Sequence, residues 1–397
     1  MKQTLTALLA AALLAATSAF AEEPVRIGVL EDMSGGFADI TGSGSVLAAT
    51  MAAEDFGGSV LGRPIEILQG DHQNKADIGS TIARRWIDED KVSLLTGLGN
   101  SAVALAVRAI AKEREVVDVV ASAGVAELTG KACSPTGFHW SYDSYALAKN
   151  TARAVVADGG KNWFFITADY AYGHSAQRDS AKFIEAAGGS VIGSVLVPPN
   201  TTDFSSYLLV AQSSGAQVVG IASAGSDFSN TIKQAGEFGL VDAGQTMAGL
   251  AVFITDVHAL GLAAAQGLYL TSPFYWDMDE KTREWSRKFF AKHNAMPTMA
   301  QAGVYSAVTH YLKSVAAAGT DNAQAVAAKM HELPVNDFWS KDVKVRADGR
   351  VMRDMHLFKV KAPSASREPW DYYEYISTVP GEEAFRPISE SECPLVK

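Results

Sequence analysis

The sequence predicts an α/β fold built from two doubly wound parallel sheets. Short runs rich in Val, Ile and Leu alternate with longer segments of helical period, which is the pattern of parallel βαβ units. The alternation forms two successive series, the first beginning at Val25 and the second near Tyr145. Each series is long enough for one doubly wound sheet, so we expect two lobes.

The first series begins with a strand over 25–30. The elements expected after it, in chain order, are a helix over 45–56, a strand over 64–68, a helix over 77–88, a strand over 92–96, a helix over 102–113 and a strand over 116–121. Asp77 is a residue type suited to cap the second of these helices. The strand over 92–96 is almost wholly apolar, as expected for a strand covered on both faces.

The second series repeats the pattern and then changes. Its expected elements are helices over 145–158, 173–187, 204–214 and 226–238, with strands over 163–167, 191–197, 218–222, near 247 and over 268–270. Residues 280–330 instead read as three successive helices, broken near Met296-Pro297 and near 318–320. Two short strands, 343–345 and 355–360, are expected around an Asp348-Gly349 turn, and the aromatic tail 370–375 is left unplaced.

The N-terminus has the pattern of an export signal. Lys2 precedes an apolar run over 5–16, and small residues surround the expected cleavage after Ala21. The run is shorter than the ~20 residues that span a bilayer. We therefore expect residues 1–21 to be a cleaved signal peptide and the protein to reach the periplasm.

The composition excludes several classes of function. A net charge of −10 with no basic cluster argues against a nucleic-acid partner. The 8 histidines are scattered without metal-ligand spacing, and we expect no metal and no cofactor. Neither a nucleophile elbow nor a phosphate-binding loop is present, which argues against an enzyme. The 2 cysteines, Cys133 and Cys393, are permitted to pair in an oxidising compartment, and the sequence leaves the pairing open.

Aromatic and small residues gather where ligands bind in open α/β sheets. Trp140, Tyr142 and Tyr145 lie where one series hands over to the next, and Tyr170 and Tyr172 follow a predicted strand. Ligands in such sheets lie outside the carboxyl ends of the strands, so these rings are candidates for a pocket wall as well as for core. The segment Gly97-Leu98-Gly99-Asn100-Ser101 places a helix N-terminus there, suited either to a plain cap or to a carboxylate.

Four loop motifs follow the predicted strands in a fixed order. They are Met33-Ser34-Gly35-Gly36, Gly97-Leu98-Gly99-Asn100-Ser101, Ser122-Ala123-Gly124-Val125-Ala126-Glu127-Leu128-Thr129 and Asp169-Tyr170-Ala171-Tyr172-Gly173. Together they resemble the periplasmic leucine/isoleucine/valine-binding proteins of ABC transporters over nearly the whole chain after residue 21. The resemblance implies a type I periplasmic-binding fold, in which a ligand is held between two closing lobes joined by three hinge crossings.

The resemblance also implies a division of the chain. The crossings are expected near 140–143, 271–273 and 346–352. The first lobe then comprises 22–141 plus 273–348, including the helical insertion, and the second lobe comprises 142–272 plus 349–397 with the C-terminal tail. The implied partners are a small-molecule ligand and the permease and ATPase of an ABC importer in the inner membrane, and we expect a monomer.

The resemblance carries the ligand contacts over residue by residue. Contacts to a ligand carboxylate map onto Asn100, Ser101, Ser122 and Gly124, and the tyrosine that covers the ligand maps onto Tyr172. With the aromatic candidates, the full predicted set is Asn100, Ser101, Ser122, Ala123, Gly124, Trp140, Tyr142, Tyr172, Ser226 and Phe253.

One departure from the family pattern bears on the ligand. Amino-acid binders carry an acid where this chain has Ala251-Val252-Phe253, and a buried ammonium without an acid costs several kcal/mol. We therefore expect a small carboxylate with an apolar or aromatic body. Asp227 or Asp256 is able to substitute for the missing acid, which leaves a branched-chain amino acid or an amide as the alternative. A secreted hydrolase and a receptor sensor domain are the other classes considered.

Overall fold

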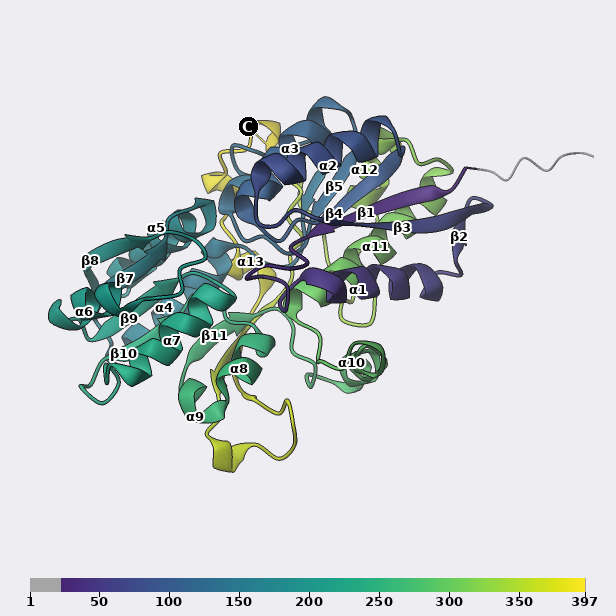
Figure 1. Ribbon diagram of the computed structural model, residues 1–397. Helices are drawn as coiled ribbons and strands as arrows, with labels where there is room; N and C mark the ends of the chain where they lie inside the picture. The colour runs from purple at the N-terminus through teal and green to yellow at the C-terminus, as the bar shows by residue number, and fades with distance from the viewer. Residues whose placement is uncertain (1–22, 397) are drawn as a thin grey trace, which may run out of the picture.

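The first sheet has six strands in the order β2-β3-β1-β4-β5-β6. The computed structural model describes residues 23–396, and the predicted signal peptide over 1–21 lies outside the described residues (Figure 1). The strands are β1 (Val25–Glu31), β2 (Ser59–Val60), β3 (Arg63–Asp71), β4 (Val92–Gly97), β5 (Val117–Val120) and β6 (Gly137–His139). All neighbours pair in parallel except the short β2. The sequence did not predict β6, because its three residues are too short for a periodic signal.

Helices cover both faces of this sheet. Along β1 the side chains alternate, so that Ile27 and Val29 join a core with α1 (Gly42–Asp55) and α11 (Met299–Ala318), whereas Leu30 packs with Trp86 on the opposite face. That opposite face is covered by α2 (Ala76–Asp88) and α3 (Ser101–Glu113). The prediction that Asp77 caps α2 was wrong: Lys75 is the N-cap, and Asp77 lies in the first turn.

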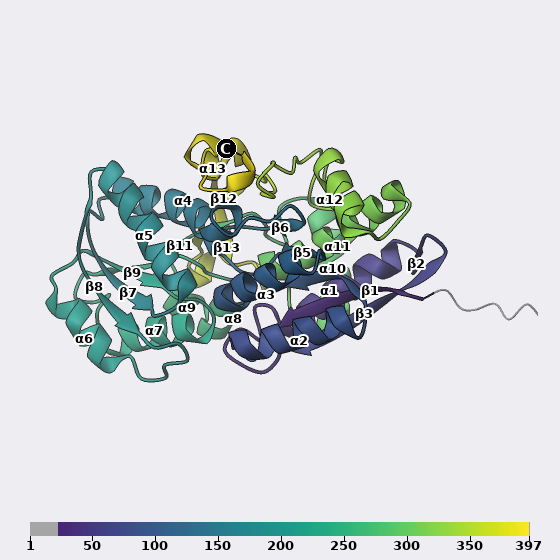
Figure 2. The same cartoon turned by 90° about the horizontal axis from the view of Figure 1, so that it is seen from above.

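The second sheet has four parallel strands in the order β10-β9-β7-β8. The strands are β7 (Asn162–Ala168), β8 (Ser190–Val197), β9 (Val218–Ala222) and β10 (Thr246–Gly249). Its helices are α4 (Ser144–Ala157), α5 (Ala171–Ala186), α6 (Ser205–Ser213) and α7 (Ser226–Glu237), followed by α8 (Ile254–Leu260) and α9 (Leu262–Ala265). Figures 1 and 2 show the two sheets in separate lobes, which confirms the predicted fold class.

The three helices predicted over 280–330 are confirmed as α10 (Glu280–His293), α11 and α12 (Ala323–Glu332). They pack on the first sheet and its helix α1. Asp279 and Thr298 cap α10 and α11 with their side chains, and a left-handed residue ends each helix, Asn294 and Gly319 respectively. This segment therefore returns from the second series to the first lobe.

A third sheet was not foreseen. It is antiparallel and joins β11 (Tyr269–Ser272), β12 (Met355–Val360) and β13 (Tyr373–Val379). The predicted hairpin between 343–345 and 355–360 was wrong: Val345 forms an isolated bridge with Val351, and β12 pairs with the aromatic tail instead. The helix α13 (Gly381–Ala384) and the segment after it then run along α4 and α5.

The chain passes between the two lobes three times. The first and third passages lie side by side, since the Val351 N–H donates to the His139 carbonyl and His139 is bridged to Arg350. The second follows β11. The precise lobe boundaries given above remain our proposal.

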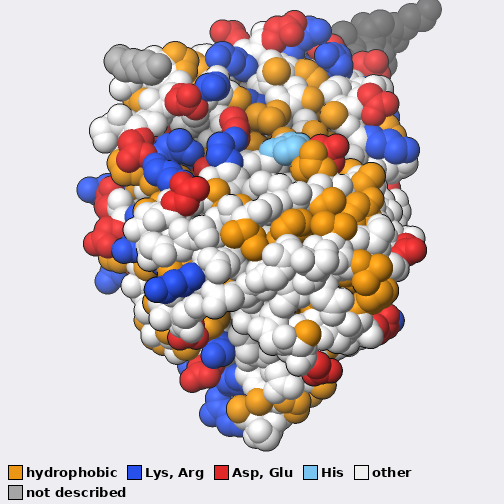
Figure 3. Space-filling view, turned by 90° about the vertical axis from the view of Figure 1, so that its left-hand side faces the viewer, with side chains coloured by type: hydrophobic (Ala, Val, Ile, Leu, Met, Phe, Trp, Pro, Cys, Tyr) orange, Lys and Arg blue, Asp and Glu red, His pale blue; other side chains and the backbone are white. Residues whose placement is uncertain are grey.

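The end of the second lobe carries exposed apolar side chains. Ile192 and Leu196 on β8 and Leu209 and Val210 on α6 are each about half exposed, and apolar patches cover part of the surface in Figure 3, which views this end of the molecule. None of the helices within 23–396 is both long enough and apolar enough to cross a bilayer.

Candidate functional site

The strand order of both sheets indicates a ligand site at the carboxyl ends of their strands. In each sheet the first strand of its series is flanked by the second on one side and the third on the other, and ligands bind at this switch point. In the first lobe the switch lies between β1 and β4, and in the second between β7 and β9. The loops that follow these strands face one another across the gap between the lobes.

A small cavity of about 20 Å³ lies between these loops. Both lobes contribute to it. Its lining residues are Phe37, Ile40, Gly99, Ser101, Ser122 and Gly124 from the first lobe, Tyr142 from the first crossing, and Tyr170, Tyr172, Ala224, Ala251 and Phe253 from the second lobe. We call it the inner cavity.

A second cavity of about 90 Å³ adjoins the first and shares Phe37, Tyr170 and Ala224 with it. Its remaining lining residues are mostly polar: Asn74, Asn100, Ala102, Pro199, Asn200, Ser226 and Asp227. We call it the outer cavity. An apolar, aromatic space therefore continues into one that is bordered by more polar residues.

Aromatic rings form the walls of the inner cavity. Tyr142 and Phe253 meet edge to face with centroids 6.1 Å apart, and Tyr170 and Tyr172 lie 6.2 Å apart. A Cβ added at Gly124 would lie only 3.0 Å from the Tyr172 ring and 3.2 Å from the Tyr142 ring, so the absence of a side chain at 124 lets the rings approach. The Tyr172 hydroxyl is buried without a hydrogen-bond partner among the described residues.

The structure brings together eight of the ten predicted residues. Six line the inner cavity: Ser101, Ser122, Gly124, Tyr142, Tyr172 and Phe253. Asn100 and Ser226 line the outer cavity. The Ser226 N–H donates to the Gly36 carbonyl at 3.1 Å, so this residue also joins the two lobes directly.

Trp140 and Ala123 do not lie where they were predicted. The Trp140 side chain is fully buried in the first lobe, where its Nε1–H donates to Ser306 on α11 and its ring packs on His310. Ala123 is buried in the core beside α3, and its carbonyl bonds the His139 ring. Ala123 lies between Ser122 and Gly124, and its side chain faces the core because direction alternates along an extended chain. Trp140 directly follows β6, and its N–H donates to the Val120 carbonyl at 2.8 Å, so it still packs with the first sheet.

The N-terminus of α3 already has a cap. Asn100 Oδ1 accepts the N–H groups of Ala102 and Val103 at 2.9 and 3.2 Å, so these two donors are not free for a ligand. Of the two interpretations of this motif, the plain helix cap therefore describes the Asn100 side chain.

Glu31, the last residue of β1, belongs to the site but was not predicted from the sequence. Its carboxylate is fully buried and accepts hydrogen bonds from the Gly99 N–H and from the hydroxyls of Ser122 and Ser45. Burial raises its pKa to about 7, against the lowering effect of these three donors. An acidic residue directly after the apolar run Val29-Leu30 of a buried strand was the available signal.

Asp227 and Asp256, the two acids considered for an ammonium, differ in their surroundings. Asp256 Oδ2 accepts the Phe253 N–H at the start of α8, and neither cavity includes Asp256. Asp227 lines the outer cavity, where Oδ2 accepts the Asn200 N–H and Oδ1 is buried without a partner in the described chain. Burial raises the pKa of Asp227 to about 6 and that of Asp256 to about 8.

Two larger hollows lie away from the strand ends. One of about 490 Å³ is bordered by the loops around 341–344 and 352–356, and one of about 290 Å³ is bordered by Glu127, Arg178 and the C-terminal tail. Both are rimmed by side chains of mixed charge, as solvated surfaces are. The aromatic cavities between the lobes are therefore the better candidate site. In residues 23–396 no group of His, Cys, Asp or Glu is arranged to hold a metal ion.

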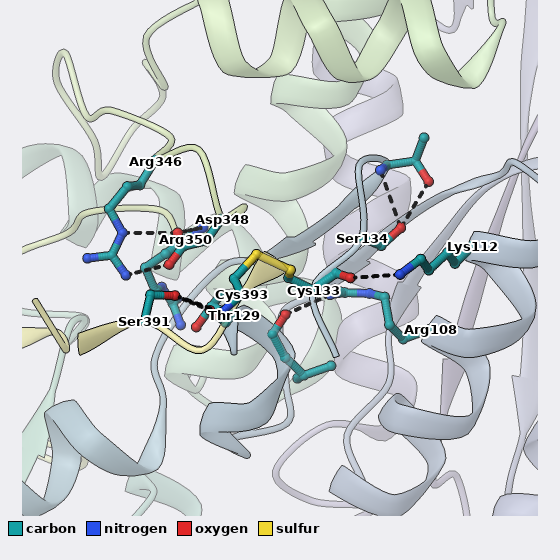
Figure 4. The surroundings of a disulfide bond; sticks show 12 residues. Arg108, Lys112, Thr129, Cys133, Ser134, Arg346, Asp348, Arg350, Ser391 and Cys393 are labelled. Carbon is teal, nitrogen blue, oxygen red and sulfur yellow. Dashed lines mark hydrogen bonds and ion pairs between the residues drawn. A yellow bond between two sulfur atoms is a disulfide. The ribbon is translucent and has the colours of Figure 1, made fainter. Parts of the chain in front are cut away.

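A disulfide joins the tail to the first lobe. Cys133 and Cys393 are bonded, with their Cα atoms 5.7 Å apart and a separation of 260 positions in sequence (Figure 4). Cys133 belongs to the loop that begins with the site residues Ser122 and Gly124. The bond therefore attaches the last residues of the chain to a segment that forms the site.

The chain is similar in sequence to known binding proteins. Residues 24–367 match the family described as periplasmic binding protein. The Leu/Ile/Val-binding protein homolog 6 of Brucella abortus (strain 2308) is 28% identical over 220 residues, which are 55% of this chain and 55% of that protein. The chain thus spans about half the length of the curated relatives it matches.

Solved structures match over a longer range. A periplasmic binding protein from Burkholderia mallei is 48% identical, with a TM-score of 0.93 over 94% of this chain and 100% of that one. A solute-binding protein of an ABC transporter from R. palustris, solved in complex with benzoate, is 20% identical with a TM-score of 0.82 over 94% of this chain and 100% of that one, a likeness of fold.

Proposed function

The chain belongs to the periplasmic binding protein family, whose members bind solutes and are not enzymes, and from this premise we propose that it captures a small carboxylate with an apolar or aromatic body. The observation that carries the proposal is the inner cavity, whose walls are Tyr142, Tyr170, Tyr172 and Phe253. We further propose that it delivers this ligand to the permease and ATPase of an ABC importer.

The polar groups of the inner cavity suit a carboxylate. Ser101 and Ser122 supply hydroxyls, and Gly124 supplies a backbone N–H in a loop without a side chain to block approach. The position after β10 supports the same ligand class, because Ala251 lines the cavity where an amino-acid binder carries an acid. A fold of this kind accommodates an aromatic acid in the R. palustris protein that binds benzoate.

A branched-chain amino acid is the second candidate. The observation that favours it is the unpartnered Oδ1 of Asp227 in the outer cavity, which is able to accept hydrogen bonds from an ammonium. The naming of the Brucella relatives as Leu/Ile/Val-binding homologues is consistent with this candidate.

A thermal-shift screen distinguishes the two candidates. We expect benzoate and related amine-free acids to stabilise the protein by about 2.7 kcal/mol when present at about 100 times the dissociation constant. Leucine, isoleucine and valine should give no shift at the same concentrations. Shifts with these amino acids alone would show that Asp227 or another acid holds an ammonium and that the carboxylate class is wrong.

Replacing Tyr172 by Ala should weaken binding of the acid about tenfold, since stacking contributes ~0.5–1.5 kcal/mol and the lost apolar contact adds to it. Tyr172 is 4% exposed between the lobes. The matched control is Tyr375→Ala on β13, where the tyrosine is 58% exposed and lines neither cavity, so the dissociation constant of this variant should stay at the wild-type value. Calorimetric titration measures both, and equal affinities for the two variants would remove Tyr172 from the site.

A further inference from the structure

Glu31 lies directly behind the first-lobe wall of the inner cavity. Its Oε2 accepts the Gly99 N–H at 2.7 Å, and its Oε1 accepts the Ser122 hydroxyl at 2.7 Å and the Ser45 hydroxyl at 3.1 Å. Gly99 and Ser122 themselves line the cavity. The Glu31 carboxylate therefore holds in place two residues, Gly99 and Ser122, that border the proposed ligand.

The backbone around Glu31 is shaped to admit this carboxylate. A Cβ at either Gly97 or Gly99 would lie 2.6 Å from a Glu31 oxygen, so a side chain at either position would clash with it. Gly97 also has a φ of +87°, which L side chains rarely adopt. The close fit fixes the carboxylate against Gly99 and Ser122.

The charges around Glu31 do not neutralise it. Asp32, the first residue after β1, raises the pKa of Glu31 further, and Ser45 on α1 is uncharged. Directly after β3, the His72 N–H donates to the Glu31 carbonyl, and burial lowers the pKa of the His72 ring to about 4, so the ring is neutral at pH 7. Beyond Ser122 lies Tyr142, a neutral phenol. Within residues 23–396, Lys and Arg side chains form no ion pair with Glu31.

The charge of Glu31 determines what Ser122 offers to the cavity. An ionised carboxylate only accepts hydrogen bonds, so it takes the Ser122 hydroxyl hydrogen and leaves only oxygen lone pairs facing the cavity. A protonated Glu31 donates its own hydrogen to Ser122 instead, and the Ser122 hydroxyl is then free to donate to a ligand. A carboxylate ligand only accepts hydrogen bonds, so it can bond the Ser122 hydroxyl only in the second arrangement.

We propose that Glu31 is a positioning residue that switches Ser122 between acceptor and donor, and that the protein binds a carboxylate with uptake of one proton by Glu31. This inference rests on the proposed function. The proton comes from solvent and is held on Oε1, facing Ser122, while Oε2 continues to accept the Gly99 N–H. The site would thus bind an anion when Glu31 is protonated, and would release the anion as the pH rises and Glu31 loses its proton.

The test is calorimetric titration of the mature protein with benzoate and 4-hydroxybenzoate at several pH values. For the wild type we expect the dissociation constant to rise about tenfold between about pH 6.5 and about pH 8.5, since ionised Glu31 must first be protonated. Titration in two buffers of different ionisation enthalpy should show uptake approaching one proton per ligand at the upper pH.

Glu31→Gln separates the switch from a purely structural role. The Gln amide nitrogen, in place of Oε1, donates to Ser122, and its oxygen accepts the Gly99 N–H, so the variant copies protonated Glu31. We expect its affinity to be independent of pH and about tenfold tighter than that of the wild type at about pH 8.5, with proton uptake near zero. A damaged fold does not produce such a gain.

Other results would overturn the inference. If the wild type binds benzoate with an affinity independent of pH, the inference is wrong and the proposed function stands. The inference is also wrong if Asp227→Asn abolishes the pH dependence of binding and Glu31→Gln preserves it, because the proton-linked group would then be in the outer cavity. If none of the acids binds at any pH, the proposed function and this inference both fail.

Discussion

Replacing Arg108 by Met should lower the free energy of unfolding by about 3–5 kcal/mol, because it leaves a buried carboxylate without its partner. Arg108 on α3 is 1% exposed, and its Nε donates to Asp118 on β5 at 2.6 Å. Its other nitrogens donate to the carbonyls of Leu128 and Phe138 at 2.9 Å. A Cβ at Gly137 would lie 2.5 Å from Nε, so that glycine makes room for the guanidinium. The side chain thus joins α3 to β5, to β6 and to the loop between these two strands.

Denaturant unfolding with matched variants checks this expectation. Arg85→Met removes an arginine that is 55% exposed and pairs with Asp90, and it should change stability by less than about 1 kcal/mol. The double variant Arg108→Met with Asp118→Leu should be more stable than Arg108→Met alone, since it removes the unpaired charge. A double variant as unstable as the single one would show that lost packing, not the unpaired charge, is responsible.

The pH dependence of the free energy of unfolding provides a second test of the role of Arg108. Burial raises the pKa of Asp118 even beside Arg108, and without the guanidinium the pKa of this carboxyl should rise further. An acid with a raised pKa binds more protons when folded than when unfolded. The stability deficit of Arg108→Met should therefore grow as the pH rises above about 4 and be smallest in acid.

The regular parts of the fold could be predicted because each carries its own pattern. The apolar runs of β1, β4, β7 and β9 and the helical periods between them are local signals, and they place the strand ends where both cavities lie. The third sheet has no such signal. β12 pairs with β13 on one side and, on the other, with β11, which lies about 85 residues earlier in the chain, and pairing at that range depends on tertiary packing.

The site was predictable where side-chain type and position agreed. Tyr142, Tyr172 and Phe253 follow strand ends and line the inner cavity, but Trp140 occupies an equivalent place in sequence and packs into the core. Trp140 still bonds to β5 through its N–H, whereas Tyr142 lies two residues further along the chain and reaches the cavity. Glu31 was missed because its role depends on donors from β4, β5 and α1, which only the folded chain brings together.

The C-terminal tail is held to both lobes by contacts of unequal strength. Towards the second lobe, Lys182 pairs with Glu390 and Arg386 with Asp179, and towards the first, Lys131 pairs with Glu392. The Lys182 and Lys131 pairs are about half exposed or more, and such pairs contribute less than about 1 kcal/mol each. The disulfide, whose cysteines are fully buried, is therefore the main attachment of the tail to the first lobe (Figure 4).

Replacing Cys133 and Cys393 by Ser should lower the free energy of unfolding by about 2–5 kcal/mol, because the bond closes a long loop and restricts the unfolded chain. Denaturant unfolding with and without reductant measures the effect. Reductant should destabilise the wild type by about the same amount and leave the double variant unchanged. Hydrogen exchange in the variant should increase over 386–396, where ion pairs and a few hydrogen bonds remain, more than in β4 or β5. Equal destabilisation of both proteins by reductant would show that the bond does not hold the tail.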